Sequence, residues 1–172
     1  MATRSLPSGI TIRAIRATDL RALERFYEAL SIDSIDARFH GAMHGIPEPA
    51  ARSFCRPDHV HREGLVAVMR QGRHDVVVGH LCLEPAGDRT VEMAVAVADA
   101  WQHRGIGRAL LDAGLEWARD RGSRHVLAAI RWSNPAIVGL LRSVGRPVRI
   151  TPTPEGDVEA DIDLTTELPA VA

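Results

Sequence analysis

The sequence contains no lysine, since all 21 of its Lys and Arg residues are arginines. A P-loop needs a lysine followed by serine or threonine, so this absence excludes one class of phosphate-binding site. Long apolar runs are also missing, because no stretch approaches the roughly 18 residues of a membrane helix. The first residues, MATRSLPSG, lack the apolar middle region of a secretory signal. We therefore expect a cytoplasmic protein without a membrane partner.

Cysteine is scarce, and neither sign of charge dominates. Cys55 and Cys82 match no metal or redox spacing, so neither a disulfide framework nor a Cys-x-x-Cys centre is expected. The formal net charge of −1 provides no basic stripe, and we expect no nucleic-acid partner. The histidine pairs at residues 40 and 44 and at 59 and 61 lack a third cluster of ligands. We interpret them as surface or capping residues and expect no metal site.

The composition is that of a folded globular domain. Hydrophobic residues make up 45% of the chain and charged residues 25%, which separates it from disordered and membrane proteins. A chain of 172 residues can bury one sizeable core. We expect residues 10–165 to form this domain, with flexible tails at residues 1–9 and 166–172.

The first part of the domain begins with a strand and a helix. Residues 10–15 alternate apolar and polar, which predicts a half-buried strand. Thr18 and Asp19 are typical of a helix start, and apolar residues then recur at helical spacing. These are Leu20, Leu23, Phe26, Tyr27 and Leu30. Residues 31–62 have no clear pattern, apart from a short helix that prolines predict over residues 47–54.

The middle of the chain predicts an antiparallel meander of three strands. The strands cover residues 65–70, 75–84 and 90–97, and polar turns at residues 71–74 and 85–88 join them. The elements that follow are a helix over residues 105–121, a strand over 125–131, a helix from about 133 to 145 and a hairpin of strands over 148–151 and 158–164. This order predicts an α/β fold in one domain, with a mixed, mostly antiparallel sheet flanked by helices.

The residues that indicate a binding site lie in the loop between the third meander strand and the helix after it. The residues there are Gln102, His103, Arg104, Gly105, Ile106, Gly107 and Arg108. A helix N-terminus offers unpaired N–H groups and partial positive charge, and glycines let a diphosphate approach the backbone. Arg104 and Arg108 could add charge-assisted hydrogen bonds. The alternative interpretation is that two glycines merely begin a helix.

A known family shares this loop. A Rossmann dinucleotide site would need a third glycine where Leu110 stands. The loop instead resembles the pyrophosphate loop of the GNAT superfamily, whose pattern Gln/Arg-x-x-Gly-x-Gly/Ala is matched by Gln102, Gly105 and Gly107. The resemblance implies a single-domain GNAT-like fold, and an N-acetyltransferase that takes its acyl group from acetyl-CoA and carries no metal.

The resemblance also implies where coenzyme A binds. In the resembling family, the strand before the loop and the strand after the helix diverge and bind the pantetheine arm between them. By position these are residues 90–97 and 125–131. The resemblance implies backbone contacts from Val95 and Val97, with an oxyanion donor near Val95. It also implies a contact from Asn134, a residue that equally suits a helix N-cap before a proline.

Glu92 is the residue that we expect to act as general base. An amine arrives protonated, with a pKa of about 10.4 for a lysine side chain, and must lose a proton before it attacks a thioester. Strand alternation places Glu92, Ala94 and Ala96 on one face, unless a bulge changes the parity. The alternative is a solvent-facing glutamate without a catalytic role. Glu63 would be the next candidate base.

Two residues depart from the family pattern. Leu141 stands where many relatives have a tyrosine general acid, and Arg146 stands where they usually have phenylalanine. A general acid for the departing sulfur is not required, because a thiol with a pKa of about 8.5 can leave as a thiolate. An alternative function is therefore a CoA-binding or sensor module that has lost catalysis.

The N-terminal half is similar to bacterial protein-lysine acetyltransferases of the Pat type. The segments that carry this similarity are residues 12–16, 29–31, 38–39 and 61–63. The resemblance implies a primary amine acceptor, which is either a protein lysine or a small molecule. It leaves both a monomer and a homodimer open.

Overall fold

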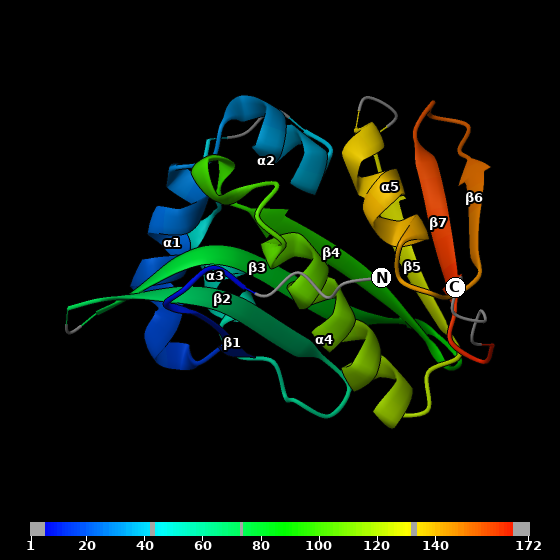
Figure 1. Ribbon diagram of the computed structural model, residues 1–172, viewed down its shortest axis with the longest axis horizontal. Helices are drawn as coiled ribbons and strands as arrows, with labels where there is room; N and C mark the ends of the chain where they lie inside the picture. The colour runs from blue at the N-terminus through cyan, green and yellow to red at the C-terminus, as the bar shows by residue number, and fades with distance from the viewer. Residues whose placement is uncertain (1–5, 42–43, 73, 132–133, 167–172) are drawn as a thin grey trace.

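The structure is a computed structural model that describes residues 6–41, 44–72, 74–131 and 134–166. A seven-stranded sheet crosses this part of the chain in the order β1-β2-β3-β4-β5-β7-β6. Helices cover both faces of the sheet (Figure 1). The predicted α/β fold with a mixed, mostly antiparallel sheet is therefore confirmed. Within the described ranges, no helix is long and apolar enough to span a bilayer.

The predicted strands are all present, with small shifts at their ends. The strands are β1 (Ile10–Ala14), β2 (Glu63–Gln71), β3 (His74–Gly87), β4 (Thr90–Val97), β5 (His125–Ile130), β6 (Val148–Pro152) and β7 (Val158–Asp163). The helices are α1 (Leu20–Glu28), α2 (Ile32–Phe39), α3 (Glu48–Phe54), α4 (Ile106–Asp120) and α5 (Pro135–Arg142). Short 3-10 turns lie at Ala17–Asp19 and Asp99–Trp101.

Helices α4 and α5 lie on the same face of the sheet (Figure 1). Helix α4 buries a continuous apolar stripe, whose residues are at most 8% exposed: Ile106, Leu110, Leu111, Leu115 and Ala118. Burying one such aliphatic side chain stabilises the fold by about 1.5–3 kcal/mol. Glycines allow the close approach, since a Cβ at Gly79 of β3 would stand 2.9 Å from Leu110 Cδ1. The stripe therefore fixes α4, and the loop before it, against the sheet.

Helix α1 covers the opposite face, where a polar pair is buried in the second core cluster. Tyr27 Oη of α1 lies 2.8 Å from His80 Nδ1 of β3, and both side chains are fully buried. Burial lowers the pKa of His80 to about 3, so the imidazole is neutral at physiological pH. The only tyrosine of the chain is therefore a hydrogen-bonded core residue on the α1 face of the sheet.

Helix α2 is the element that the sequence patterns did not predict. Its N-cap is Ser31, whose Oγ accepts a hydrogen bond from the N–H of Ser34 (3.2 Å). At this end, Ser31 Oγ and Ser34 Oγ donate to Asp99 Oδ1, over 2.7 and 2.8 Å. At the other end, Arg131 Nη2 donates to Asp36 Oδ1 over 2.8 Å. Helix α2 therefore spans from the turn after β4 to the end of β5.

Strand β3 is longer than predicted, because the expected turn at residues 85–88 begins later. Proline cannot donate a hydrogen bond to the sheet, and Pro85 is tolerated because the β3–β4 register shifts between Pro85 and Gly87. The chain then reverses at Arg89, whose φ is +52°. The predicted strands over 125–131 and 158–164 each end one residue early, at Ile130 and Asp163.

Strands β4 and β5 form the parallel pair of the sheet, and they pair over a short length only. Residues Thr90–Glu92 pair with His125–Leu127. Beyond these residues the strands separate, although β4 stays paired with β3 to Val97 and β5 with β7 to Ile130. In the described part of the chain, the facing edges of β4 and β5 thus carry N–H and C=O groups that no neighbouring strand satisfies.

Candidate active site

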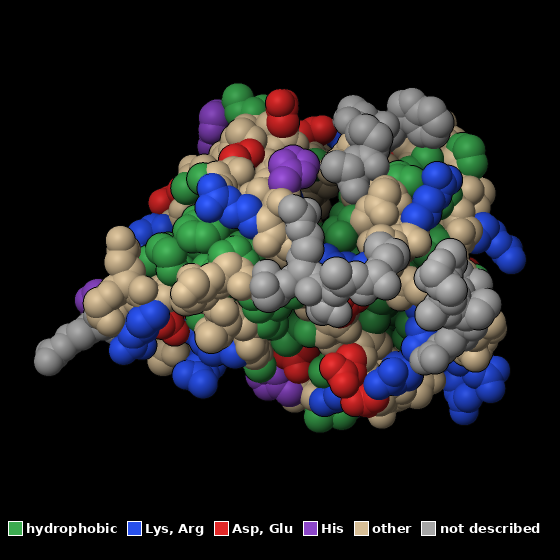
Figure 2. Space-filling view, viewed as in Figure 1, with side chains coloured by type: hydrophobic (Ala, Val, Ile, Leu, Met, Phe, Trp, Pro, Cys, Tyr) green, Lys and Arg blue, Asp and Glu red, His purple; other side chains and the backbone are tan. Residues whose placement is uncertain are grey.

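A cavity of about 620 Å³ occupies the opening between β4 and β5. Its walls are β4 residues 93–97, β5 residues 128–130, the start of α4, and the facing sides of α2 and α5. The surface is hollowed between α2 and α5 in the space-filling view (Figure 2). The volume falls within the range of small-molecule and cofactor sites.

The N-terminus of α4 opens into this cavity without a side-chain cap. By contrast, Ser31 caps α2 and Asn134 caps α5. The N-cap residue of α4 is Gly105, whose φ of +87° is a left-handed conformation that favours glycine. The first hydrogen bond of the helix runs from Ala109 N–H to Gly105 O (3.0 Å). The N–H groups of the preceding residues therefore suit a diphosphate.

Gly107 lines the cavity one residue into α4. A Cβ at this position would lie 3.6 Å from both Leu140 Cδ2 and Val97 Cγ2, which is ordinary van der Waals contact. The backbone fold thus tolerates a methyl group, whereas a larger side chain would occupy space between α4, α5 and β4. The glycine keeps that space open beside the helix N-terminus.

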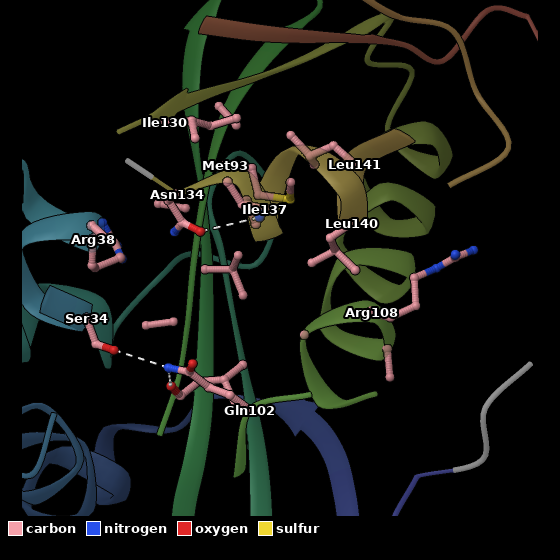
Figure 3. A pocket seen from close by; sticks show the side chains of 18 of the residues that line it. Ser34, Arg38, Met93, Gln102, Arg108, Ile130, Asn134, Ile137, Leu140 and Leu141 are labelled. Carbon is pink, nitrogen blue, oxygen red and sulfur yellow. Dashed lines mark hydrogen bonds between the residues drawn. The ribbon is translucent and has the colours of Figure 1, made fainter. Parts of the chain in front are cut away.

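Gln102 fixes the loop to both neighbouring walls of the cavity. Its Nε2 donates to Ser34 Oγ of α2 and to Val97 O of β4, each over 3.1 Å (Figure 3). His103, with a φ of +58°, also lines the cavity. Gln102 therefore holds the loop in place through contacts within the protein.

The two arginines of the loop have different surroundings. Arg108 lines the cavity and links α4 to the end of α5: Nε donates to Asp112 Oδ1 and Nη1 to the carbonyl of Ser143, both over 2.7 Å. The Arg104 guanidinium stacks over the Trp101 ring, 5.1 Å from its centroid, and Arg104 is not among the lining residues described. Ile106 buries its side chain in the core, so only its backbone faces the loop.

The opposite wall contains the remaining predicted contact residues. Val95 and Val97 line the cavity from β4. Asn134 lines it at the start of α5, where Oδ1 accepts from the N–H of Ile137 (3.4 Å), and the amide NH2 donates to no residue in the described ranges. Leu141 is 1% exposed and also contributes to the wall. Leu141, which is apolar, thus occupies the position at which many relatives have a tyrosine general acid.

Glu92 lies where β4 and β5 begin to separate, opposite Glu84 of β3 and Leu127 of β5. The register of β3 and β4 is unbroken from Val91 to Val97, so Glu92, Ala94 and Ala96 share one face as the alternation predicts. The Glu92 side chain is exposed. In the described part of the chain, no residue donates a hydrogen bond to its carboxylate, which is at the edge of the cavity rather than among its lining residues.

Glu63, the second candidate for the base, is on the other face of the sheet. It pairs with Leu83 of β3, which lies in the core beneath α4, and it is 6% exposed. Its Oε1 is 2.7 Å from His59 Nδ1 and accepts from the N–H of Gly64. The structure thus removes Glu63 from consideration, because the carboxylate is bound and turned away from Glu92.

Sequence reasoning missed the contribution of α2 to the site. Ser34 and Arg38 lie one helical turn apart and face the cavity from α2, while Leu140 and Leu141 face it from α5 (Figure 3). The sequence carries only a weak signal for this helix, namely an N-cap residue at Ser31 and Ile35 and Phe39 at helical spacing. Among the described residues, no group of three or more His, Cys, Asp or Glu side chains could hold a metal ion.

The comparisons with known proteins agree with this geometry. The profile of the acetyltransferase (GNAT) family matches residues 23–145. A comparison with curated proteins gave no match. The GNAT domain of S. lividans PAT is 26% identical, with a TM-score of 0.79 and 89% of each chain covered.

Two further solved structures share the fold. Ribosomal-protein-alanine N-acetyltransferase from Brucella melitensis is 26% identical, with a TM-score of 0.73, and the match covers 90% of this chain and 99% of that one. Spermidine N-acetyltransferase from Vibrio cholerae, in complex with CoA and spermine, is 17% identical, with a TM-score of 0.70 and coverage of 91% and 95%.

Proposed function

Since the chain belongs to the acetyltransferase (GNAT) family, we propose that it transfers an acetyl or related short acyl group from acyl-CoA to a primary amine, with Glu92 as the general base. The observation that carries this proposal is the continuity of the site. One cavity runs from the uncapped N-terminus of α4, along the unpaired edges of β4 and β5, toward Glu92. The first part suits a diphosphate, the second an amide-containing arm and the third a reacting amine.

Coenzyme A supplies the activated thioester, and the residues of this chain hold and orient it. The N–H groups of Gly105 to Arg108 would bind the diphosphate, helped by the partial positive charge of the helix end. The unpaired edges of β4 and β5 would bind the amides of the pantetheine arm, as Val95 and Val97 line the cavity there. The amide NH2 of Asn134 is available for a further contact.

Glu92 would accept the proton of the incoming ammonium group, directly or through a water molecule. Its exposed carboxylate is reachable from solvent, and no described residue competes for it through a hydrogen bond. A backbone N–H near Val95 would donate to the oxygen of the acyl carbonyl as negative charge develops. Leu141 cannot donate a proton, so the thiolate would leave without help from α5.

Amines of several kinds are candidates for the acceptor. The similar structures include one enzyme named for an alanine of a ribosomal protein and one for spermidine. The similarity to a PAT domain makes a protein lysine one candidate, with a small-molecule amine as the other. The reaction would take place in the cytoplasm, where the buried, free thiols of Cys55 and Cys82 stay reduced.

The second candidate function is a CoA-binding module or sensor without turnover. The specific observation in its favour is Leu141. This apolar side chain occupies the position at which many relatives have a tyrosine general acid. The two functions predict the same binding of acetyl-CoA. They differ in whether an amine accelerates the release of free thiol.

The test is thiol release from acetyl-CoA with a panel of lysine peptides, polyamines and amino acids, corrected for hydrolysis. We expect release that depends on the amine and gives an equal amount of acylated product. Because the chain contains no lysine, acetyl-lysine detected in the assay must belong to the acceptor. Tight binding of acetyl-CoA without amine-dependent release for any amine would support the sensor and contradict the transferase.

A further inference from the structure

Arg38 is a cation in the cavity wall without a carboxylate partner in the described part of the chain. Its Nη2 donates to Cys82 Sγ over 3.0 Å, and its Nε is buried without a partner. The buried hydroxyl of Tyr27 is a further polar neighbour of the guanidinium, and it is not a carboxylate. Removing a charged group from water is costly unless it is paired, and neither the thiol nor the nearby aromatic rings neutralise this charge, so the guanidinium suits an anionic partner that arrives from outside.

The guanidinium is held in place rather than free to move into solvent. It lies 4.7 Å from the centroid of the Phe39 ring and 5.6 Å from that of Phe54. Burial would lower the pKa of Arg38, but its neighbours raise that pKa above the ordinary value, and Glu92 is among them. Tyr27 and Cys82 are uncharged at neutral pH, because burial raises the pKa of both. Glu92 is the carboxylate among these neighbours.

The register of the sheet brings Arg38 and Glu92 to the same face of the sheet. Arg38 contacts Cys82 of β3, and Cys82 is directly opposite Ala94 of β4. Glu92 lies two residues before Ala94 on the same face, which is a diagonal separation of about 7–8 Å from Cys82. No ion pair joins Arg38 and Glu92. Arg38 and Glu92 thus lie toward the same face of the sheet, near the point where β4 and β5 separate.

We propose that Arg38 binds the carboxylate of a free amino acid whose ammonium group faces Glu92. This inference rests on the proposed function, because Glu92 is the base in that proposal. A zwitterion matches the two charges in sign, and an α-, β- or γ-amino acid carries them a few ångströms apart. The guanidinium has donors to spare, since it carries five N–H groups, Cys82 Sγ accepts from one of them, and no described carboxylate pairs with it.

The other acceptor classes fit this pair of residues less well. A lysine within a protein and a polyamine bring no carboxylate next to the reacting amine. A polyamine would also place a second cation near Arg38. A dicarboxylic acyl group such as succinyl offers the same carboxylate chemistry from the donor side, and the experiment must distinguish the two sources.

The test compares amino acids with their own carboxamides as acceptors. The probes are L-α-amino acids, β-alanine and 4-aminobutanoate, each paired with its amide, and kcat/KM is measured with acetyl-CoA. The wild type should prefer the acid. Arg38→Met, which keeps an apolar side chain between the two rings, should reduce the ratio of acid to amide by about 10- to 100-fold.

Two further variants make the comparison decisive. Arg38→Lys keeps the charge without the planar fork and should give a ratio between those of the wild type and Arg38→Met. Arg21→Met removes an arginine with a highly exposed side chain on α1 and should leave the ratio unchanged. Circular dichroism and acetyl-CoA affinity show whether each variant folds. An equal ratio in the wild type and a folded Arg38 variant would overturn the proposal.

Binding measurements separate this inference from the proposed function. Amino acids and their amides are titrated into the wild-type complex with CoA, in which no transfer takes place. Tighter binding of the acid, lost in Arg38→Met, would support the carboxylate site even if turnover were absent. Equal binding of acid and amide would overturn it. A loss of succinyl-CoA affinity in Arg38→Met, without a change in acetyl-CoA affinity or in the acceptor ratio, would assign Arg38 to the acyl group and overturn the acceptor assignment.

Discussion

Gln102 donates a hydrogen bond from Nε2 to Ser34 Oγ over 3.1 Å, and this bond joins the loop before α4 to helix α2. The same nitrogen donates to Val97 O at the end of β4. The residue that matches the first position of the family loop thus connects that loop to two walls of the cavity, α2 and β4. Its contribution to cofactor binding is expected to come from the position it gives the loop.

Gln102→Ala should weaken acetyl-CoA binding and lower stability together. The variant loses two hydrogen bonds, each worth about 1 kcal/mol, and leaves Val97 O without its partner. For a chain of this size, we expect a Tm lower by about 2–4 °C per kcal/mol lost. Calorimetry measures both quantities. Gln71→Ala, at an exposed end of β2, is the control, and equal affinities for the two variants would contradict the role of Gln102.

Gly107→Val should abolish most acetyl-CoA binding while the protein stays folded. Gly107→Ala adds only a methyl group in ordinary contact with Leu140 and Val97, so its effect should be much smaller. The valine methyl groups extend further, into the space between α4 and α5. Gly139→Val on α5 is the matched control, because a Cβ there meets nothing within 4 Å. A folded Gly107→Val variant with wild-type affinity would show that the diphosphate binds elsewhere.

The pair of Tyr27 and His80 should make stability depend on pH. Burial lowers the pKa of His80 to about 3, whereas an unfolded histidine titrates near 6.5. Between these values the unfolded chain binds a proton that the folded chain does not. The stabilising contribution is therefore complete above about pH 6.5 and falls as the pH drops, by up to about 1.4 kcal/mol per pH unit.

The double variant Tyr27→Phe/His80→Leu removes both polar groups at once and should flatten this dependence. Urea unfolding at several pH values between about 4 and 7 measures the slope of the free energy of unfolding. His61→Leu, which replaces an exposed histidine, is the control for the loss of an imidazole elsewhere in the chain. The same slope in the double variant and the wild type would mean that other groups cause the acid sensitivity.

The fold was largely predictable because its signals are local. Alternation marks Thr90–Val97 as a strand with both ends correct, and an apolar stripe marks α4. The predicted loop residues Gln102 and Gly107 do line the cavity. The strand and the helix follow from periodicity and Gly107 from helix-start chemistry, whereas Gln102 was implied by the resemblance to the family loop.

Helix α2 and its role were not predictable in the same way. The helix buries little apolar surface, with Ile35 fully inside and Ile32 63% exposed, so its periodicity is weak. The position of Arg38 against Cys82 joins residues that are distant in the sequence and depends on tertiary packing. The burial of Glu63 likewise depends on its strand register and on His59. Contacts of this kind have no signature in the local pattern.

The central prediction concerns Glu92 as the general base. Glu92→Gln keeps the size of the side chain but cannot accept a proton, so the rate on an amine acceptor should fall far more than acetyl-CoA affinity. General-base assistance is worth about 10²–10⁴-fold, and a loss in that range is expected at neutral pH. Glu84→Gln is the matched control, because Glu84 is directly opposite in the sheet and its carboxylate is bound by Arg62 Nη2 over 2.7 Å.

The most direct measurement is kcat/KM of wild type, Glu92→Gln and Glu84→Gln with one verified amine acceptor, from about pH 6.5 to about pH 9. We predict that only Glu92→Gln loses activity strongly near pH 7. We also predict that it recovers as the pH rises, because more of the amine is then deprotonated before it binds. Equal rates for Glu92→Gln and the wild type across this range would contradict the account.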